Sequence, residues 1–350
     1  MKPRCAIVEC YNRHDEVYLG TVHLLNRLGY HVELFTTWRN RTKNVFVYAA
    51  ELDCTVHWRL RHADVLAAAA EGRHEFVVFN TFEGEAVLDA GRRMIATTPI
   101  IGFVHNAAFL RSRPAYGEFL DHRRCRLAVL APHVRQRIAD ITDALCVTPV
   151  FFHDRPLPAS RPRDGRARFC VQGYFDSLRR QYGLLLEALQ QLADEGRDRF
   201  EVRVMGRNFS PDFRAFHGEV ARRGLAPLVR YAWKGIGYRS YYALLDGADF
   251  ILPLVGPDSH PDYFETKATS SMAAAIGFAK IPIADARLAG FYGLEDASFT
   301  YTDDLASAMR AALASSDALR RAHQQSMARA RQRWLDESAR QLRSAIAAFA

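Results

Sequence analysis

The chain has 350 residues, which at roughly 150 residues per domain predicts about two domains. Hydrophobic residues make up 49% and charged residues 25% of the sequence, which excludes a disordered chain, a collagen-like repeat and a small disulfide scaffold. The 47 Lys and Arg against 39 Asp and Glu give a formal charge of +8, which favours polyanionic partners such as nucleotide phosphates, nucleic acid or an anionic membrane surface.

The cysteines and the first residues bear on where the protein works. The 6 cysteines contain no C-x-x-C pair, so we expect buried, reduced thiols and no structural zinc site. The apolar run after Arg4 is too short for a signal peptide, and no stretch approaches the ~18 apolar residues that span a bilayer. We expect a cytoplasmic protein, with peripheral contact to the inner membrane left open.

In the first half, short apolar runs alternate with segments of helical periodicity. A helix is predicted over 15–28, where apolar residues follow helical spacing up to Gly29, a common helix stop. Strands are predicted over 5–9, 31–35, 75–79, 99–104, 127–130 and 145–147. Strands separated by helices indicate βαβ units and a parallel sheet.

A change of composition follows this half. Pro149, Pro156, Pro158 and Pro162 fall in one short stretch that also contains several arginines. Because proline lacks a backbone N–H and resists helix formation, we predict an interdomain linker over 151–167, with a surface loop within one domain as the alternative. The predicted domains are then 1–150 and 168–316, followed by a helix over 317–350.

The second half returns to the same alternation. Strands are predicted over 168–172, 200–205, 228–232, 249–255 and 281–284, and helices after Gly173, over 211–223, 239–245 and 266–278, and from about Asp317. The sequence therefore predicts an α/β protein with two doubly wound parallel-sheet, Rossmann-like domains facing across a cleft, and a long C-terminal helix. In such sheets, ligands bind at the carboxyl ends of the strands.

Several catalytic signatures are absent from the sequence. It contains no G-x-x-x-x-G-K-[ST], which argues against a P-loop kinase or ATPase, and no H-E-x-x-H or G-x-S-x-G. It also lacks Asp-x-Asp, the carboxylate pair that would hold a divalent metal against a diphosphate. We therefore predict no metal and no separate cofactor.

The stretch over 258–282 (DSHPDYFETKATSSMAAAIGFAKIP) carries the clearest sign of a binding site. Lys267, Thr269, Ser270 and Ser271 fall in the first turn of the helix predicted there. Free N–H groups, hydroxyls and a lysine at a helix N-terminus predict an anion site, best suited to phosphate. A capped helix whose alanine-rich face packs on the sheet is the alternative.

Several short stretches of the second half together form a pattern that points to a known family. They are 171–173 (VQG), Arg180 before 183–189 (GLLLEAL), 200–206 (FEVRVMG), 241–253 (YYALLDGADFILP) and 267–271 (KATSS). With them, the chain resembles the nucleotide-sugar-binding domain of GT-B glycosyltransferases of the bacterial surface-polysaccharide type. The first half adds 29–35 and His105, and the final helix is similar to the one that crosses back onto the first domain in such enzymes.

The resemblance implies roles for four residues. Gly173 would let the backbone approach the donor diphosphate, and Arg180, at the family's usual lysine position, would offset its charge as the sugar leaves. Thr269 and Ser270, at a helix terminus, would do the same without a metal. The donor would be a nucleotide-diphosphate sugar.

The chain also departs from the family pattern. Many retaining members carry Glu-x7-Glu here, but anchoring on Pro282 puts Lys267 and Ala275 at those two positions. Glu265, two residues out of register, is the nearest carboxylate and is kept as a donor-binding candidate. Retaining chemistry and the usual grip on the ribose are therefore left open.

Candidates in the first domain follow its predicted strands. His14 has a pKa suited to a general base and Asp15 could orient it, although both also suit an ordinary helix N-terminus. His105 resembles a histidine that contacts the donor sugar in the retaining group, with a loop histidine bonded to backbone as the alternative. Glu83 and Glu85 either contact acceptor hydroxyls or simply begin a helix.

The sequence thus predicts a metal-independent glycosyltransferase that moves a sugar from a nucleotide-diphosphate donor to a glycan or lipid-linked acceptor. Peripheral contact with an anionic membrane suits the charge, whereas the dispersed arginines argue against nucleic-acid binding. Two alternatives stay open: a catalytically inactive GT-B-like scaffold or partner subunit, and a nucleotide-sugar epimerase on the same fold.

Overall fold

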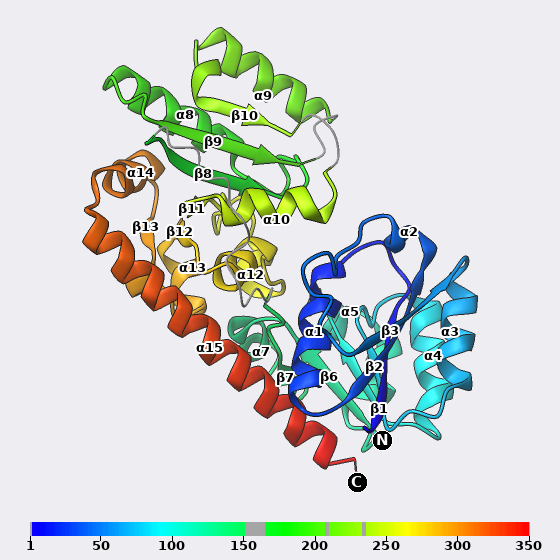
Figure 1. Ribbon diagram of the computed structural model, residues 1–350. Coiled ribbons are helices and arrows are strands. Elements are labelled where there is room, and N and C mark those ends of the chain that lie inside the picture. The colour runs from blue at the N-terminus through cyan, green and yellow to red at the C-terminus, as the bar shows by residue number, and fades with distance from the viewer. Residues whose placement is uncertain (1, 151–164, 207–209, 233–235, 350) are drawn as a thin grey trace. The chain divides into compact units, whose positions relative to one another are not determined.

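The protein is described by a computed structural model over residues 2–150, 165–206, 210–232 and 236–349 (Figure 1). The predicted linker over 151–167 lies outside these residues except for its last three positions. The chain forms two compact units, of which the first comprises Met1–Phe152, Glu265–Ala268 and Gln332–Ala350. The second comprises His153–Phe264 and Thr269–Arg331.

The first unit contains a seven-stranded sheet in which every pairing is parallel. Its strands are β1 (Arg4–Glu9), β2 (His31–Thr37), β3 (Cys54–Arg59), β4 (Val77–Phe79), β5 (Ile100–Phe103), β6 (Cys125–Val129) and β7 (Leu145–Cys146). Their order is β3-β2-β1-β4-β5-β6-β7, so the direction of winding reverses between β1 and β4. The central strands are buried on both faces, as helix-covered parallel sheets require.

Helices cover both faces of this sheet. They are α1 (Asp15–Arg27), α2 (Trp38–Arg41), α3 (His62–Glu71), α4 (Glu85–Ile95), α5 (Ala108–Ser112), α6 (Gly117–Leu120) and α7 (Pro132–Arg137), with a short 3-10 helix at Pro114–Tyr116. α1 lies on one side, and α3 and α4 lie together on the other (Figure 1). Right-handed crossovers produce this arrangement, because the chain winds outward from β1 in both directions.

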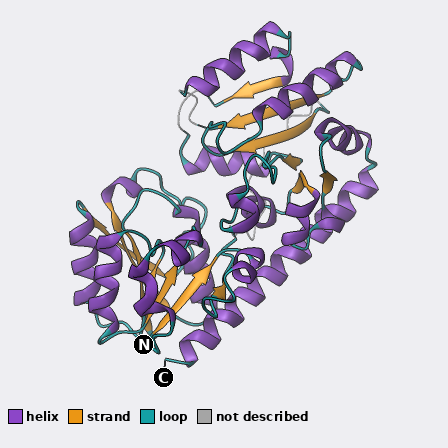
Figure 2. Cartoon of the chain, turned by 180° about the vertical axis from the view of Figure 1, so that it is seen from behind, coloured by secondary structure: helices purple, strands orange, loops and turns teal. Residues whose placement is uncertain are grey.

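The second unit contains a six-stranded sheet, again parallel throughout, in the order β10-β9-β8-β11-β12-β13. Figure 2 shows strands of both units with helices packed beside them. Its strands are β8 (Ala167–Gln172), β9 (Phe200–Met205), β10 (Val229–Tyr231), β11 (Phe250–Ile251), β12 (Ile281–Asp285) and β13 (Phe299–Tyr301). Its winding reverses between β8 and β11. Both predicted parallel sheets are thereby confirmed.

The helices of the second unit correct one prediction. They are α8 (Tyr182–Asp194), α9 (Pro211–Arg222), α10 (Tyr238–Asp246), α11 (Asp262–Glu265), α12 (Ser270–Gly277), α13 (Ala286–Phe291) and α14 (Leu305–Ala314), with 3-10 helices at Ala226–Leu228 and Glu295–Ala297. The helix predicted over 266–278 was wrong at its start. It begins at Ser270 because the Thr269 hydroxyl accepts the Ser271 N–H and caps it there, 3.3 Å away.

The last helix, α15 (Asp317–Ala347), is the longest in the described chain, and its C-terminal part belongs to the first unit. There the buried Ser338 hydroxyl accepts the backbone N–H of Thr148 at 3.1 Å, and Arg27 pairs with Asp336 at 2.7 Å. No helix among the described residues is long and apolar enough to cross a membrane.

Candidate functional site

The carboxyl edge of the first sheet gathers polar side chains from three strands. Glu9 is the last residue of β1, Asn80 and Thr81 directly follow β4, and His105 follows β5. Because β1 and β4 are neighbours at the point where the winding reverses, this edge is where an open α/β sheet binds ligands.

His14 joins this group from the turn between β1 and α1. Its backbone is left-handed, with φ of 58° and ψ of 29°, a conformation that costs a non-glycine residue about 1–3 kcal/mol. The strained turn sets the imidazole of His14 flat against that of His105, with ring centroids 3.5 Å apart and planes 10° from parallel. Two histidines that the sequence suggested separately therefore lie in contact with each other.

A hydrogen-bond chain runs from a buried carboxyl group to the His14 ring. Thr81 Oγ1 lies 2.8 Å from Glu9 Oε2 and 3.1 Å from His14 Nδ1. Thr81 has one hydroxyl proton, so it can donate to only one of these two partners. When it donates to Glu9, the Thr81 oxygen accepts from Nδ1–H of His14, and Nε2 of His14 keeps a free lone pair. When Glu9 is protonated, its hydroxyl donates to Thr81 and the Thr81 hydroxyl donates to Nδ1 of His14. The proton of the neutral His14 ring then lies on Nε2.

His105 has its tautomer fixed by a single contact. Its Nε2 lies 2.7 Å from the backbone carbonyl oxygen of Asn80, which can only accept. Nε2 therefore carries the proton, and Nδ1 is left as an acceptor. The Asn80 side-chain amide meanwhile donates to Glu9 and to the carbonyl of His14, at 3.2 Å in the latter case.

Burial controls the charges in this group. It raises the pKa of Glu9 to about 8, against the opposing hydrogen bonds from Asn80, Tyr11 and Thr81. It lowers the pKa of His105 to about 4, and it lowers the pKa of His14 well below its ordinary value. Both imidazoles are therefore neutral at pH 7, the form that accepts a proton or a hydroxyl hydrogen bond.

The other first-domain candidates have different surroundings. Asp15 is buried and pairs with Lys43 at 2.8 Å, and the His14 ring nitrogen bonds Thr81 instead. A Glu83 carboxylate oxygen accepts the backbone N–H of His105 at 2.8 Å, so it holds the loop after β5. Glu85 is exposed as the first residue of α4, where an acid favours the helix dipole.

Residues 265–268 belong to the first unit, whereas the other predicted donor-binding residues belong to the second. The Thr266 carbonyl accepts the N–H of Ala107 at 2.9 Å, and the Lys267 carbonyl lies 3.3 Å from His133 Nε2. Glu265 lies 3.8 Å from Arg137. The expectation that Lys267 lies in the first turn of α12 was therefore wrong, because these tertiary bonds keep its backbone out of the helix.

The second unit has its own cluster at the carboxyl end of β8, around Gly173. This glycine has φ of +102°, and a Cβ there would meet Arg180 Nη2 at 2.7 Å. Arg180 is buried, donating from Nε to the Gln172 carbonyl at 2.9 Å and from Nη2 to Ser271 Oγ at 3.2 Å. No ion pair among the described residues includes Arg180, so its charge stays uncompensated beside the α12 N-terminus.

Gln172 organises this cluster, although it was not among the predicted site residues. Its Nε2 donates to Ser270 Oγ at 3.1 Å, and its Oε1 accepts from the Tyr241 hydroxyl at 2.6 Å. Ser270 is exposed and its oxygen accepts a bond, so its hydroxyl proton is free to donate to an anion, whereas Ser271 is fully buried. The position of Gln172, as the last residue of the strand at the reversal point, was the available signal.

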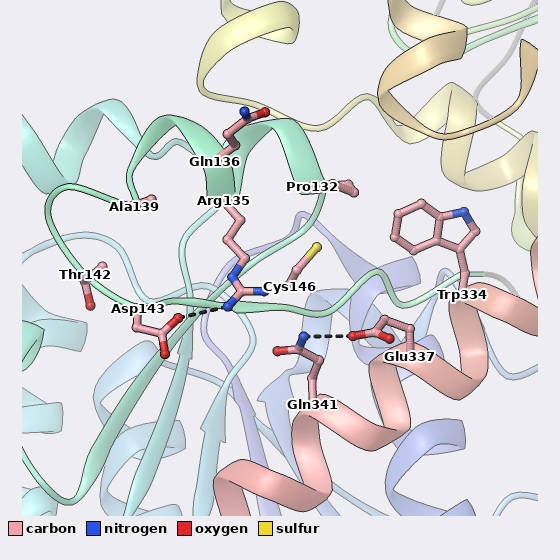
Figure 3. Close-up of a pocket in the computed structure, with 10 residues that line it drawn as sticks. All are labelled: Pro132, Arg135, Gln136, Ala139, Thr142, Asp143, Cys146, Trp334, Glu337 and Gln341. Atoms are coloured by element: carbon pink, nitrogen blue, oxygen red, sulfur yellow. Dashed lines mark hydrogen bonds and ion pairs between the residues drawn. The ribbon is translucent and has the colours of Figure 1, made fainter.

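Two further features of the structure bear on the site. In the described part of the chain, no group of three His, Cys, Asp or Glu is arranged to hold a metal ion. A cavity of about 720 Å³ lies in the first unit between α7 and α15 (Figure 3). Trp334, the Arg135–Asp143 pair and Gln341 line it, and none of the predicted site residues does.

The sequence matches no protein-family model and no curated protein. The fold is shared with solved structures. A glycosyltransferase from Rickettsia africae gives a TM-score of 0.70 at 11% identity, over 99% of this chain and 98% of that chain. HepE from Anabaena, in complex with UDP and glucose, gives 0.68 at 15% identity over 99% of each chain.

A third solved structure extends this likeness. The α,α-trehalose-phosphate synthase (UDP-forming) from Burkholderia vietnamiensis gives a TM-score of 0.62 at 11% identity, over 98% of this chain and 96% of that one. Together these structures confirm the resemblance to GT-B glycosyltransferases at the level of the fold.

Proposed function

We propose that the chain is a glycosyltransferase that moves a sugar from a nucleotide-diphosphate donor to an acceptor hydroxyl. The observation that carries the proposal is the chemistry at the two reversal points. One sheet ends in a pair of neutral, stacked histidines, and the other ends beside a buried arginine at a helix N-terminus. The shared fold with HepE, solved with UDP and glucose, supports this reading and makes UDP the first nucleotide to test.

The second unit would hold the donor diphosphate. Ser270 and the N-terminus of α12 supply donors, and the buried charge of Arg180 offsets the negative charge that grows on the leaving group. Gly173 carries no Cβ and so leaves room for the Arg180 guanidinium at the end of β8. With these groups the proposed reaction needs no metal ion.

The first unit would supply the base. As the acceptor oxygen attacks the anomeric carbon, the bond from that carbon to the diphosphate oxygen breaks, and the acceptor proton passes to Nε2 of His14. Ionised Glu9, acting through Thr81, keeps the proton of His14 on Nδ1 and so leaves Nε2 free. Glu9 and Thr81 are positioning residues in this account, and the His105 ring stacks against the imidazole of His14.

A catalytically inactive scaffold is the second candidate, and one observation favours it. Ala275 is fully buried within α12, and Lys267 stands outside that helix, so neither position offers the carboxylate that many retaining members carry. A scaffold predicts no donor turnover and no effect of His14→Ala.

The test is nucleoside diphosphate release from UDP-sugars, with and without glycan or lipid-linked acceptors. We expect acceptor-dependent release that His14→Ala reduces by about 10²-fold or more, in line with the loss of a positioned base. His122→Ala is the matched control, because this histidine precedes β6 at the opposite edge of the same sheet. Absence of release under all these conditions would favour the scaffold, and release that His14→Ala leaves unchanged would remove His14 as the base. Sugar conversion without an acceptor would favour an epimerase.

A further inference from the structure

Two large apolar side chains are exposed together at the carboxyl edge of the first sheet. Thr37 of β2 and Arg59 of β3 are paired in register, so Trp38 and Leu60 follow at neighbouring positions. Trp38 is 45% exposed and Leu60 is 82% exposed. Among the described residues of the first unit, no other large hydrophobic side chain is exposed to this degree.

The same two segments are strongly basic. Residues 38–43 (WRNRTK) and 59–62 (RLRH) contain no Asp or Glu. Lys43 pairs with Asp15 and Arg61 pairs with Asp64. The remaining cations, Arg39, Arg41 and Arg59, make no ion pair with any described residue.

This surface is firmly attached to the turn that carries His14. The buried side chain of Asn40, in α2, donates to the Tyr11 carbonyl at 3.1 Å and to Thr36 Oγ1 at 2.9 Å. Lys43 Nζ donates to the Asn12 carbonyl at 2.7 Å. A molecule held on the surface is therefore held close to the proposed base.

We infer that residues 38–43 and 59–62 form a docking surface for an anionic lipid bilayer. An exposed leucine beside a tryptophan suits the boundary between lipid headgroups and acyl chains, and unpaired arginines suit lipid phosphates. Arg41 lies 4.3 Å from the centroid of the Trp38 ring, so the charge and the apolar surface act at one place. Nucleic acid would match the charge but leave Leu60 exposed, which favours the bilayer.

The inference rests on the proposed function and deepens it. A bilayer against this surface would present a lipid-linked acceptor beside His14, which selects the lipid-linked alternative over a free glycan.

The experiment is co-sedimentation of the full chain with vesicles of phosphatidylcholine alone or with phosphatidylglycerol. We expect binding to the anionic vesicles that falls with added salt. Arg39→Gln with Arg41→Gln should weaken the partition by roughly 25-fold, at about fivefold for each arginine near an anionic surface. Leu60→Ser should weaken it as well.

Matched controls come from the exposed part of α15 in the second unit. Arg321→Gln with Arg329→Gln removes the same charge, and Leu319→Ser removes a leucine that is 44% exposed. Neither should change vesicle binding. The inference is overturned if the unmodified chain ignores anionic vesicles, if the controls weaken binding equally, or if Arg39 and Arg41 bind duplex DNA while vesicles stay unbound.

Thermal shift with UDP on the same variants separates this inference from the proposed function. A UDP shift without vesicle binding removes only the docking surface. Vesicle binding without a thermal shift from any nucleoside diphosphate removes the transferase and leaves the surface standing.

Discussion

Thr81 is the position where one hydroxyl group tests the proposed chemistry. Its oxygen stands between Glu9 Oε2 and His14 Nδ1, at 2.8 and 3.1 Å, and the side chain is buried. Thr81→Val keeps the shape and removes both hydrogen bonds. Thr81→Ser keeps the hydroxyl and serves as the matched control.

The structure sets the size of the effect. Thr81→Val leaves the Nδ1 of His14 unpaired, while Glu9 still receives bonds from Asn80 and from the N–H of Tyr11. One buried polar group without a partner costs about 1–3 kcal/mol, so urea unfolding should show a loss of that order. Activity should fall at least about tenfold, as part of the 10²–10⁴-fold that a positioned base contributes.

The pH dependence gives a sharper readout than the rate alone. The raised pKa of Glu9, about 8, keeps this carboxyl protonated below that pH, which places the proton of His14 on Nε2. Ionisation of Glu9 moves the proton to Nδ1, so the rate should rise as the pH passes through about 8. Thr81→Val should lose this rise and Thr81→Ser should keep it.

The assay is nucleotide release as a function of pH, with nitrogen NMR of the His14 ring as a direct view of its tautomer. If Thr81→Val matches Thr81→Ser in both rate and pH profile, the chain from Glu9 to His14 has no role in the reaction.

Three further predictions concern other groups. Gly173→Ala should lower the free energy of unfolding in urea by about 1–3 kcal/mol, because φ is +102° and the new Cβ would meet Arg180. The control is Gly183→Ala in α8, where a new Cβ meets nothing within 4 Å and should not destabilise the protein. Arg180→Gln should weaken UDP binding by roughly 10- to 100-fold in calorimetry, the loss of one charge-assisted hydrogen bond, while Arg179→Gln, on an exposed side chain, should not. The pKa of His105 is lowered to about 4 in the folded protein, so as the pH falls this histidine is protonated in the unfolded chain before it is protonated in the folded one. Its contribution to stability is therefore complete above pH 6.5 and falls by up to about 3 kcal/mol as the pH drops to 4. Unfolding of His105→Asn at a series of pH values should show a flatter curve.

Strands were predictable where the buried run is continuous. The core of β1, residues 5–8 (CAIV), is almost fully buried and reads as a parallel strand from sequence alone. β3 (CTVHWR) was missed because it lies at the sheet edge, none of its residues is fully buried, and polar residues interrupt its apolar ones. The start of α12 was misjudged because the Thr266 and Lys267 carbonyls bond residues far away in the chain.

The sequence suggested single members of the candidate site and not their arrangement. His14 and His105 stand after predicted strands, which is a local signal, but their stacking depends on a left-handed turn and on the order of strands in the sheet. Glu9 and Thr81 were missed because a single polar residue at a strand end has no periodicity that marks it. Only the reversal between β1 and β4 brings them together.

The most direct test of the central claim is a thermal-shift titration with UDP and UDP-glucose, in the presence and absence of EDTA. Saturation at about 100 times Kd should stabilise the chain by about 2.7 kcal/mol, with the same shift in EDTA and a much smaller one for Arg180→Gln. No shift with any nucleoside diphosphate, or a shift that requires a divalent metal, would contradict the proposed donor site.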